Sequence, residues 1–336
     1  RMRILIHFDP GPSKDAFLGA RLRKNIKGAL ELQNIVWVDS IYAKADICHL
    51  LSPLDEALAK EAKEEGIPIV TSAFYTEDDP FASFLSRNVL GDYTLTLKGK
   101  KLLEMSDCIL VPNFEAKEIL QKNFPEKRIE VVTPGVNPLR FEILDDVVKK
   151  SFFYYERFGE NEKYFLSVGT YADKKTLTKL KKLAEAVPEC RFFFIGGDYG
   201  GKASPLNSLN KRNPKNLRFL PLLADDLYRS ALKGASGLLL FDSLFGKEML
   251  VLENFACKTP VFLLNAEEEK ETIKGITTLP TMEKSVNILS SFSQKDLEET
   301  IMSGYQVAEE NDLMRLGSSL KTIYESLLLN KEGSTK

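Results

Sequence analysis

Hydrophobic residues along this chain fall into short continuous runs that alternate with longer stretches of helical periodicity. Short apolar runs rich in β-branched residues are typical of parallel strands that are buried on both faces. The stretches between them place apolar residues three and four positions apart, as amphipathic helices do. This alternation predicts an α/β protein whose parallel sheets are covered by helices on both faces.

In the first half of the chain the pattern predicts a domain over residues 1–150. One helix is expected to begin after Leu51, with Ser52 as its N-cap and Pro53 in its first turn. Another is expected to open at Asn113, with Glu115 in its first turn. The strands are expected at 3–7, 35–38, 47–51, 68–72, 108–111 and 129–132.

The second half repeats this rhythm and predicts a second domain over residues 151–310, followed by a C-terminal helix and tail over 311–336. Two doubly wound, Rossmann-like domains that face each other across a cleft are therefore expected, with ligands outside the carboxyl ends of the strands. Strands are expected at 164–168, 191–195, 217–219, 237–241 and 260–264, helices at 175–187, 224–234 and 247–257, and only helices beyond residue 280.

Composition narrows the class of protein. The length of 336 residues suits two domains of roughly 150 residues each. A net charge of −2 argues against nucleic acid as a partner. No apolar run reaches the roughly 18 residues of a membrane span, and no signal peptide is recognisable, so we expect a cytoplasmic protein. The widely separated cysteines are interpreted as buried, reduced thiols: Cys48, Cys108, Cys190 and Cys257.

The segment 241–261 combines a strand, a glycine turn, a helix and a second strand. Gly246 permits close approach of the backbone, and the helix that follows directs free N–H groups at a ligand such as a diphosphate. Glu253 lies in an apolar part of this helix. It either reaches water or an ion-pair partner, or it accepts hydrogen bonds from a ligand such as ribose hydroxyls.

Lysines stand at two predicted helix N-termini, where the helix dipole disfavours cations. Lys247 precedes one helix, and Lys174 and Lys175 begin another. They are either solvated or face a bound anion. The only histidines, His7 and His49, end predicted strands of the first half and are either crevice residues or satisfied core residues.

Several consecutive segments resemble the retaining glycosyltransferases of family 4, which have the GT-B fold. The resemblance lies in the order of these segments along the chain. It covers Asp107–Pro112, Thr133–Phe141, Phe165–Gly169 followed by Lys175, Phe194–Asp198, Asn216–Leu220, Leu227–Ala231 and Glu253–Val261.

The resemblance implies a hexosyltransferase that moves a sugar with retention from a nucleotide sugar, with a UDP-sugar favoured. The second domain would hold the donor and the first a lipid or glycan acceptor, without a metal or other cofactor. The departing phosphate itself would take the acceptor's proton. The implied donor-binding residues are Gly169 and Lys175 for the diphosphate, Thr170 next to them, Gly246, Lys247, Met249 and Leu250 in the turn, and Glu253 for the ribose.

Three positions depart from the family pattern. Phe245 stands where the first glutamate of the E-x7-E pair belongs, Thr170 replaces an arginine, and the usual histidine falls near Phe74. The nearest carboxylates are Glu248 and Asp242, and we expect Glu248 and Lys175 to carry catalysis. The alternative is a weak or inactive GT-B scaffold that supports another glycosyltransferase. An epimerase of this fold is disfavoured because its paired acids and histidines are missing.

Two basic helical stretches bear on the acceptor. Residues 19–32 look like the first helix of bacterial enzymes that glycosylate glucosyl-diacylglycerol or similar lipids. Basic residues on an apolar helix suit peripheral attachment to an anionic membrane, here its inner face, although a solvated helix face is the default explanation. The basic residues are Arg21, Arg23, Lys24 and Lys27 in 19–32, and Lys98, Lys100 and Lys101 in 92–104.

Overall fold

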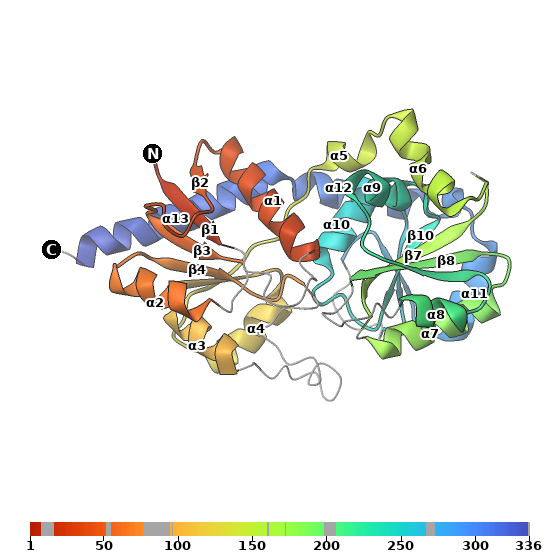
Figure 1. Cartoon of the computed structure of the whole chain (residues 1–336), viewed down its shortest axis with the longest axis horizontal. Helices are drawn as coiled ribbons and strands as arrows, with labels where there is room; N and C mark the ends of the chain where they lie inside the picture. The colour runs from red at the N-terminus through yellow and green to blue at the C-terminus, as the bar shows by residue number, and fades with distance from the viewer. Residues whose placement is uncertain are drawn as a thin grey trace. The chain divides into compact units, whose positions relative to one another are not determined.

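The computed structural model describes residues 1–7, 17–51, 55–76, 95, 97–159, 161–171, 173–197, 206–266 and 273–334 (Figure 1). The chain divides into two compact units. Each unit contains a six-stranded parallel sheet flanked by helices, as the sequence pattern predicts. Unit 1 comprises Arg1–Gly135, Phe245–Met249 and Asn311–Lys336, and unit 2 comprises Val136–Leu244 and Leu250–Glu310.

The sheet of unit 1 has the strand order β2-β1-β3-β4-β5-β6. The chain passes from β1 to β2 on one side and to the remaining strands on the other, so its topological switch point lies between β1 and β3. β3, β4 and β5 are buried along their whole length, which explains their continuous apolar runs. The strands are β1 (Arg3–His7), β2 (Val36–Val38), β3 (Ile47–Leu50), β4 (Ile69–Ser72), β5 (Cys108–Val111) and β6 (Ile129–Val131).

Among the described residues, α1 and α13 cover one face of this sheet and α2, α3 and α4 cover the other (Figure 1). The cap of α2 differs from the prediction, because Asp55 rather than Ser52 accepts the hydrogen bond of the Leu58 N–H at 2.9 Å. The predicted cap of α4 is confirmed, since Asn113 Oδ1 accepts from the Ala116 N–H. The helices are α1 (Phe17–Leu32), α2 (Glu56–Glu64), α3 (Leu97–Met105), α4 (Phe114–Asn123) and α13 (Leu313–Ser334). Ser52 and Pro53 lie outside the described residues.

The C-terminal helix α13, which the sequence analysis sets apart from both domains, is tied into unit 1 by His49. The His49 Nδ1 atom lies 2.6 Å from the Tyr324 hydroxyl of α13, and Nε2 lies 2.8 Å from Ser72 Oγ. Complete burial lowers the pKa of His49 to about 3. His49 is therefore a neutral, satisfied core residue, and its interpretation as a crevice residue is wrong.

The sheet of unit 2 has the order β12-β11-β10-β7-β8-β9, which places its switch point between β7 and β10. β12 was not expected, because the polar threonines of ITTL interrupt the apolar run that marks a buried strand. The strands are β7 (Tyr164–Thr170), β8 (Arg191–Gly197), β9 (Leu217–Leu220), β10 (Gly237–Phe241), β11 (Val261–Leu264) and β12 (Ile276–Leu279).

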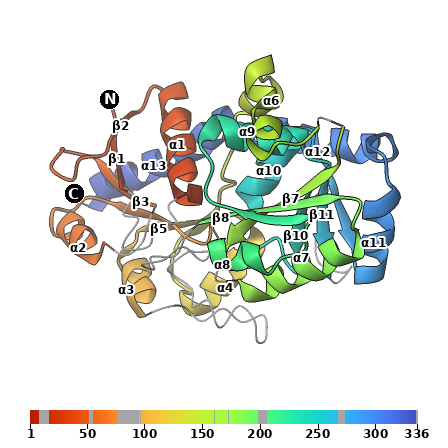
Figure 2. The same ribbon diagram turned by 45° about the vertical axis from the view of Figure 1, so that its right-hand side comes forward.

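Helices cover both faces of the sheet of unit 2. Leucines of α7 pack with phenylalanines of β7 and β8 on one face, where α8 and α11 also lie (Figure 2). The four cysteines of the chain are buried and unbridged, as predicted. The helices are α5 (Pro138–Glu142), α6 (Asp146–Glu156), α7 (Lys174–Ala186), α8 (Leu206–Lys211), α9 (Asp225–Gly234), α10 (Glu248–Ala256), α11 (Met282–Ser291) and α12 (Glu298–Glu310).

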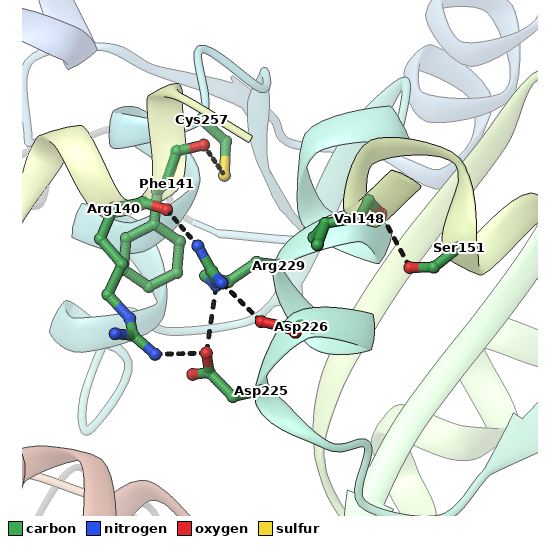
Figure 3. Close-up of polar contacts among 8 residues, drawn as sticks. All are labelled: Arg140, Phe141, Val148, Ser151, Asp225, Asp226, Arg229 and Cys257. Carbon is green, nitrogen blue, oxygen red and sulfur yellow. Dashed lines mark hydrogen bonds and ion pairs between the residues drawn. The ribbon is translucent and has the colours of Figure 1, made fainter. Parts of the chain in front are cut away.

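The segment 136–150, which the sequence analysis assigns to the first domain, belongs to unit 2. Figure 3 shows the polar contacts that dock α5 onto α9. The Arg229 guanidinium donates to the Arg140 carbonyl at 2.7 Å and to Asp226 at 2.6 Å. Asp225 accepts from both Arg229 and Arg140. Because the Arg229 side chain is only 15% exposed, these bonds are largely shielded from water and fix α5 to unit 2.

Candidate functional site

The carboxyl edge of the unit 2 sheet ends on two adjacent glycines. Gly169 of β7 lies in register with Gly196 of β8, and a Cβ atom on Gly196 would lie 3.0 Å from the Gly169 carbonyl oxygen. The side chains of Phe194 and Tyr171 crowd the same position, so the space beside Gly196 is filled. The next residue, Thr170, is 2% exposed, so its side chain faces the interior. Gly169, by contrast, is only half-buried, so its backbone is accessible at this edge of the sheet.

The helix that follows β7 begins with the two lysines noted in the sequence. Asp173 is its N-cap and accepts from the Thr176 N–H at 3.1 Å and the Thr176 hydroxyl at 2.6 Å. This carboxylate supplies negative charge at the positive end of the helix dipole, so Lys174 and Lys175 do not by themselves require a bound anion. Both lysines are exposed and accessible to one.

The residue directly after β10 has unusual backbone geometry. Asp242 has a φ of +68°, and Asn265, after the neighbouring strand β11, has a φ of +57°. Non-glycine residues in this region store strain that often marks functional sites. Asp242 itself forms an ion pair with Lys179 of α7. Its carboxylate is therefore engaged within the protein, which weakens its candidacy as a sugar-binding group.

The turn before α10 requires its glycine, because Gly246 has a φ of +72°. The sequence left open whether Glu253 reaches water. At 2% exposure it does not, and a carboxylate buried to this extent must be held by polar partners. α10 starts with residues of unit 1 and continues in unit 2. The predicted site residues of this segment are all buried: Gly246, Lys247, Glu248, Met249, Leu250 and Glu253.

Glu248, in the first turn of α10, has one satisfied and one unsatisfied oxygen. Its Oε1 accepts from Asn113 Nδ2, while its buried Oε2 has no hydrogen-bond partner among the residues described. Burial raises the pKa of Glu248 to about 7, and the nearby Glu115 adds to this, whereas the bond from Asn113 opposes it. The site therefore contains a carboxyl group that titrates near neutral pH.

Asn113 is the site residue that the sequence analysis misses. Its Oδ1 caps α4, as predicted, while its Nδ2 orients Glu248. The role of Asn113 as a helix cap already explains its place in the sequence. Nothing in the neighbouring residues therefore indicated that its amide nitrogen also bonds to Glu248. The only available signal was a polar residue directly after the predicted strand 108–111, at a carboxyl edge.

Two departures from the family pattern prove to be neighbours. Phe74 and Phe245 pack edge to face, with ring centroids 5.5 Å apart. Phe74 is fully buried at a φ of +64°, and Phe245 is 5% exposed in the core of unit 1. An apolar aromatic pair thus occupies the places where the resemblance implies a histidine and a glutamate, so neither place provides a polar group.

The basic residues of α1 are less available than the sequence implied. Lys27 pairs with Asp39 at 3.3 Å and lies 4.0 Å above the Trp37 ring. Arg21 and Arg23 are partly buried, which leaves Lys24 exposed. On α3, by contrast, all three lysines are exposed beside Leu97, which is 72% exposed. Exposed basic charge next to an exposed leucine is therefore a property of α3.

The predicted site residues fall into two groups. Gly169, Thr170, Lys175, Leu250 and Glu253 belong to unit 2, whereas Gly246–Met249 belong to unit 1. His7, at the end of β1 in unit 1, lies 2.9 Å from Asp55. In the part of the chain that the structure describes, no three His, Cys, Asp or Glu side chains are arranged to hold a metal ion, and no helix has the length and hydropathy to cross a membrane.

A comparison with protein-family models finds no match to this chain. Among curated proteins, it is similar to the processive diacylglycerol α-glucosyltransferase of Acholeplasma laidlawii. The two are 21% identical over 314 residues, which cover 90% of this chain and 91% of the relative.

Solved structures resemble the chain over almost its whole length. Sucrose-phosphate synthase of Thermosynechococcus elongatus matches with a TM-score of 0.70 at 12% identity and covers 98% of this chain and 100% of its own. HepE of Anabaena, solved with UDP-glucose, matches with a TM-score of 0.71 at 12% identity, over 97% and 100%. These likenesses show that the chain has the GT-B fold, as the sequence resemblance implied.

Proposed function

We propose that this protein is a glycosyltransferase that moves a sugar with retention from a UDP-sugar to a lipid acceptor. The observation that carries the proposal is the similarity to a diacylglycerol glucosyltransferase along 90% of the chain. The fold shared with HepE, which was solved with UDP-glucose, supports the choice of donor. A glycan acceptor remains the alternative to the lipid.

The carboxyl edge of unit 2 would hold the donor. The Gly169 backbone, the exposed Lys175 ammonium and the start of α10 would meet the diphosphate, and Glu253 the ribose. Thr170 and Leu250 are buried, so they would contribute backbone groups or shape. Charge that develops on the departing diphosphate is best stabilised by groups fixed in advance, such as helix N-terminal N–H groups.

In the transfer step, the acceptor hydroxyl oxygen bonds to the anomeric carbon while the bond from that carbon to the diphosphate breaks. An oxygen of the departing phosphate takes the hydroxyl proton on the same face of the sugar. The protein needs no nucleophile, and its part is to position the reactants and stabilise charge. Glu248 would hold a sugar hydroxyl through Oε2, with Asn113 as its positioning residue.

The experiment that tests the function measures UDP release from UDP-glucose, with and without vesicles that contain diacylglycerol. We expect release that depends on the vesicles, together with a calorimetric titration in which UDP binds and GDP binds more weakly. Absence of UDP binding would refute the proposal. The Phe74–Phe245 pair favours the scaffold as a second candidate, and UDP binding without release beyond the uncatalysed rate would establish that candidate instead.

Replacing Lys175 with alanine should weaken UDP binding by about 2 kcal/mol, the usual scale of a charge-assisted hydrogen bond. The side chain is exposed, so the fold should be unaffected. Lys174→Ala is the matched control, because it removes the same charge one residue away from an equally exposed position. Calorimetry with UDP distinguishes the two variants. An equal loss in both would show that only general charge matters, and no loss in Lys175→Ala would remove this residue from the site.

An anionic membrane surface is the partner that the exposed lysines of α3 would bind. Each lysine near an anionic surface contributes about 1 kcal/mol. The double variant Lys98→Gln and Lys101→Gln should therefore bind phosphatidylserine vesicles with an affinity roughly 30-fold lower at low salt. The affinity is measured by sedimentation with the vesicles. Lys60→Gln with Lys63→Gln, on α2, serves as the control for charge alone. If wild-type protein stays in the supernatant with such vesicles at low salt, this attachment is refuted.

A further inference from the structure

A cavity of about 760 Å³ lies at the amino edge of the unit 2 sheet. Its lining includes the residues at which three neighbouring strands begin, namely Lys163 before β7, Arg191 of β8 and Asn216 before β9. Gly169 lies near the opposite end of β7, at a distance of roughly 20 Å from Lys163 at 3.3 Å per residue. The cavity is therefore distinct from the proposed donor site, and its volume falls in the range of ligand pockets, about 300–1,000 Å³.

Glu156, one of the residues that line this cavity, has an unsatisfied carboxylate oxygen. The Glu156 side chain, at the end of α6, is only 2% exposed, and its Oε2 lies 3.3 Å from Arg218 Nε. Its Oε1 is buried and has no hydrogen-bond partner in the described part of the chain. Burial raises the pKa of Glu156 in spite of Arg218 and Arg191. A buried acceptor without a hydrogen-bond donor destabilises a protein. A ligand that donates a hydrogen bond to this oxygen would remove that cost.

Two further polar side chains of the wall have partners within the protein. Arg191 Nε lies 2.7 Å from Glu162 Oε2, and its guanidinium lies 5.0 Å above the Phe158 ring. The Asn216 amide donates to the carbonyls of residues 184, 187 and 190 and so holds the chain before β8 and β9 in place. The wall thus offers fixed donors and acceptors while most of its charge is balanced.

The wall carries charges of both signs, with the basic residues Lys163, Arg191, Lys215 and Arg218 and the carboxylates Glu156, Glu162 and Glu189. An anion would be drawn to the basic groups but repelled by the three carboxylates, and a cation would meet the reverse. A hydroxyl group, by contrast, donates to a carboxylate and accepts from a guanidinium at the same time. A ligand that carries several hydroxyl groups and no charge matches the unsatisfied oxygen and the guanidinium groups beside it.

We propose that this cavity binds an uncharged saccharide, with one hydroxyl donating to Glu156 Oε1 and neighbouring hydroxyls accepting from Arg218. The site does not depend on the proposed transfer reaction. In a glycosyltransferase it would hold a sugar-bearing acceptor or product away from the point of transfer.

The test uses maltose as the probe and the full-length protein saturated with UDP, so that the donor site is occupied. Saturation-transfer NMR should detect maltose binding to the wild-type protein at millimolar concentration. Glu156→Gln keeps the shape of the side chain but removes the charge-assisted bond, so it should weaken maltose binding about tenfold. Glu162→Gln is the matched control, because this glutamate also lines the cavity but is 47% exposed and paired with Arg191.

Three results would overturn the proposal. They are no maltose signal with the wild-type protein, equal maltose affinity in wild type and Glu156→Gln, and displacement of maltose by inorganic phosphate at a lower concentration than by glucose. The affinity for UDP should be the same in all three proteins. A failure of the saccharide site is thereby separated from a failure of the proposed function, which UDP binding and release report independently.

Discussion

Replacing Gly317 with alanine should lower the free energy of unfolding of unit 1 by about 3 kcal/mol, at the upper end of the usual cost of overpacking. A Cβ atom on Gly317, in α13, would lie 2.4 Å from the Ala29 carbonyl oxygen and 3.1 Å from its carbon, in α1. Both atoms belong to the backbone of a helix, so neither can turn away as a side chain would. The two helices must separate along their whole contact to make room.

Urea unfolding followed by tryptophan fluorescence measures this effect. Trp37 is the only tryptophan of the chain and lies on β2, so its emission reports unit 1. Gly333→Ala is the matched control, because it changes a glycine of the same helix with no atom within 4 Å of the new Cβ. That variant should be as stable as the wild type or slightly more stable, given the higher helix propensity of alanine. Equal midpoints for the two variants would contradict a close crossing of α1 and α13.

Glu248 alone should lower the free energy of unfolding of unit 1 by about 3 kcal/mol as the pH rises from 4.5 to 7. Its pKa is raised from 4.5 to about 7 in the folded protein. Between these values the folded protein keeps the proton and the unfolded chain has lost it, so stability decreases with pH. The full contribution is present below pH 4.5 and is lost above pH 7, at 1.36 kcal/mol for each unit of pKa shift.

Glu248→Gln removes this titration and keeps an oxygen that can accept from Asn113. The difference in unfolding free energy between variant and wild type, measured with Trp37, should therefore shift in favour of the variant from pH 4.5 to pH 7. Other titrating groups are common to both proteins and cancel. Glu118→Gln, at an exposed position of α4, is the control and should show a constant difference from wild type. A constant difference for Glu248→Gln would show that the carboxyl group is not held in its protonated form.

The strands show what the sequence by itself determines. The bounds of β1, β5 and β10 were predicted to the residue. Strands of a parallel sheet that is covered on both faces consist of continuous apolar runs, which can be recognised in the sequence. β12 was missed because its threonines are only half-buried and interrupt such a run. Local hydrogen bonding is equally readable, as the cap at Asn113 illustrates, although several capping residues in a row leave the exact start open.

The site shows what only the tertiary structure decides. The sequence identified the turn at Gly246 and the carboxylate of Glu248, but it could not show that Glu248 meets Asn113 or that Phe74 meets Phe245. Likewise, the ion pair of Asp242 with Lys179 joins residues from two different strand–helix units. These partners lie far apart in the chain, and their pairing depends on which strand ends become neighbours in the sheet.

The place of the last helix has the same explanation. The apolar stripe of the predicted C-terminal helix in 311–336 indicates that this helix packs against the protein, but every buried face of an α/β protein offers an apolar surface. Two contacts with residues far away in the sequence place α13 on unit 1. The hydroxyl of Tyr324 reaches His49, and Gly317 lets the α13 backbone approach Ala29. Periodicity along a chain records burial and local geometry, whereas the choice of partner is made by shape and hydrogen bonding between surfaces that exist only after folding.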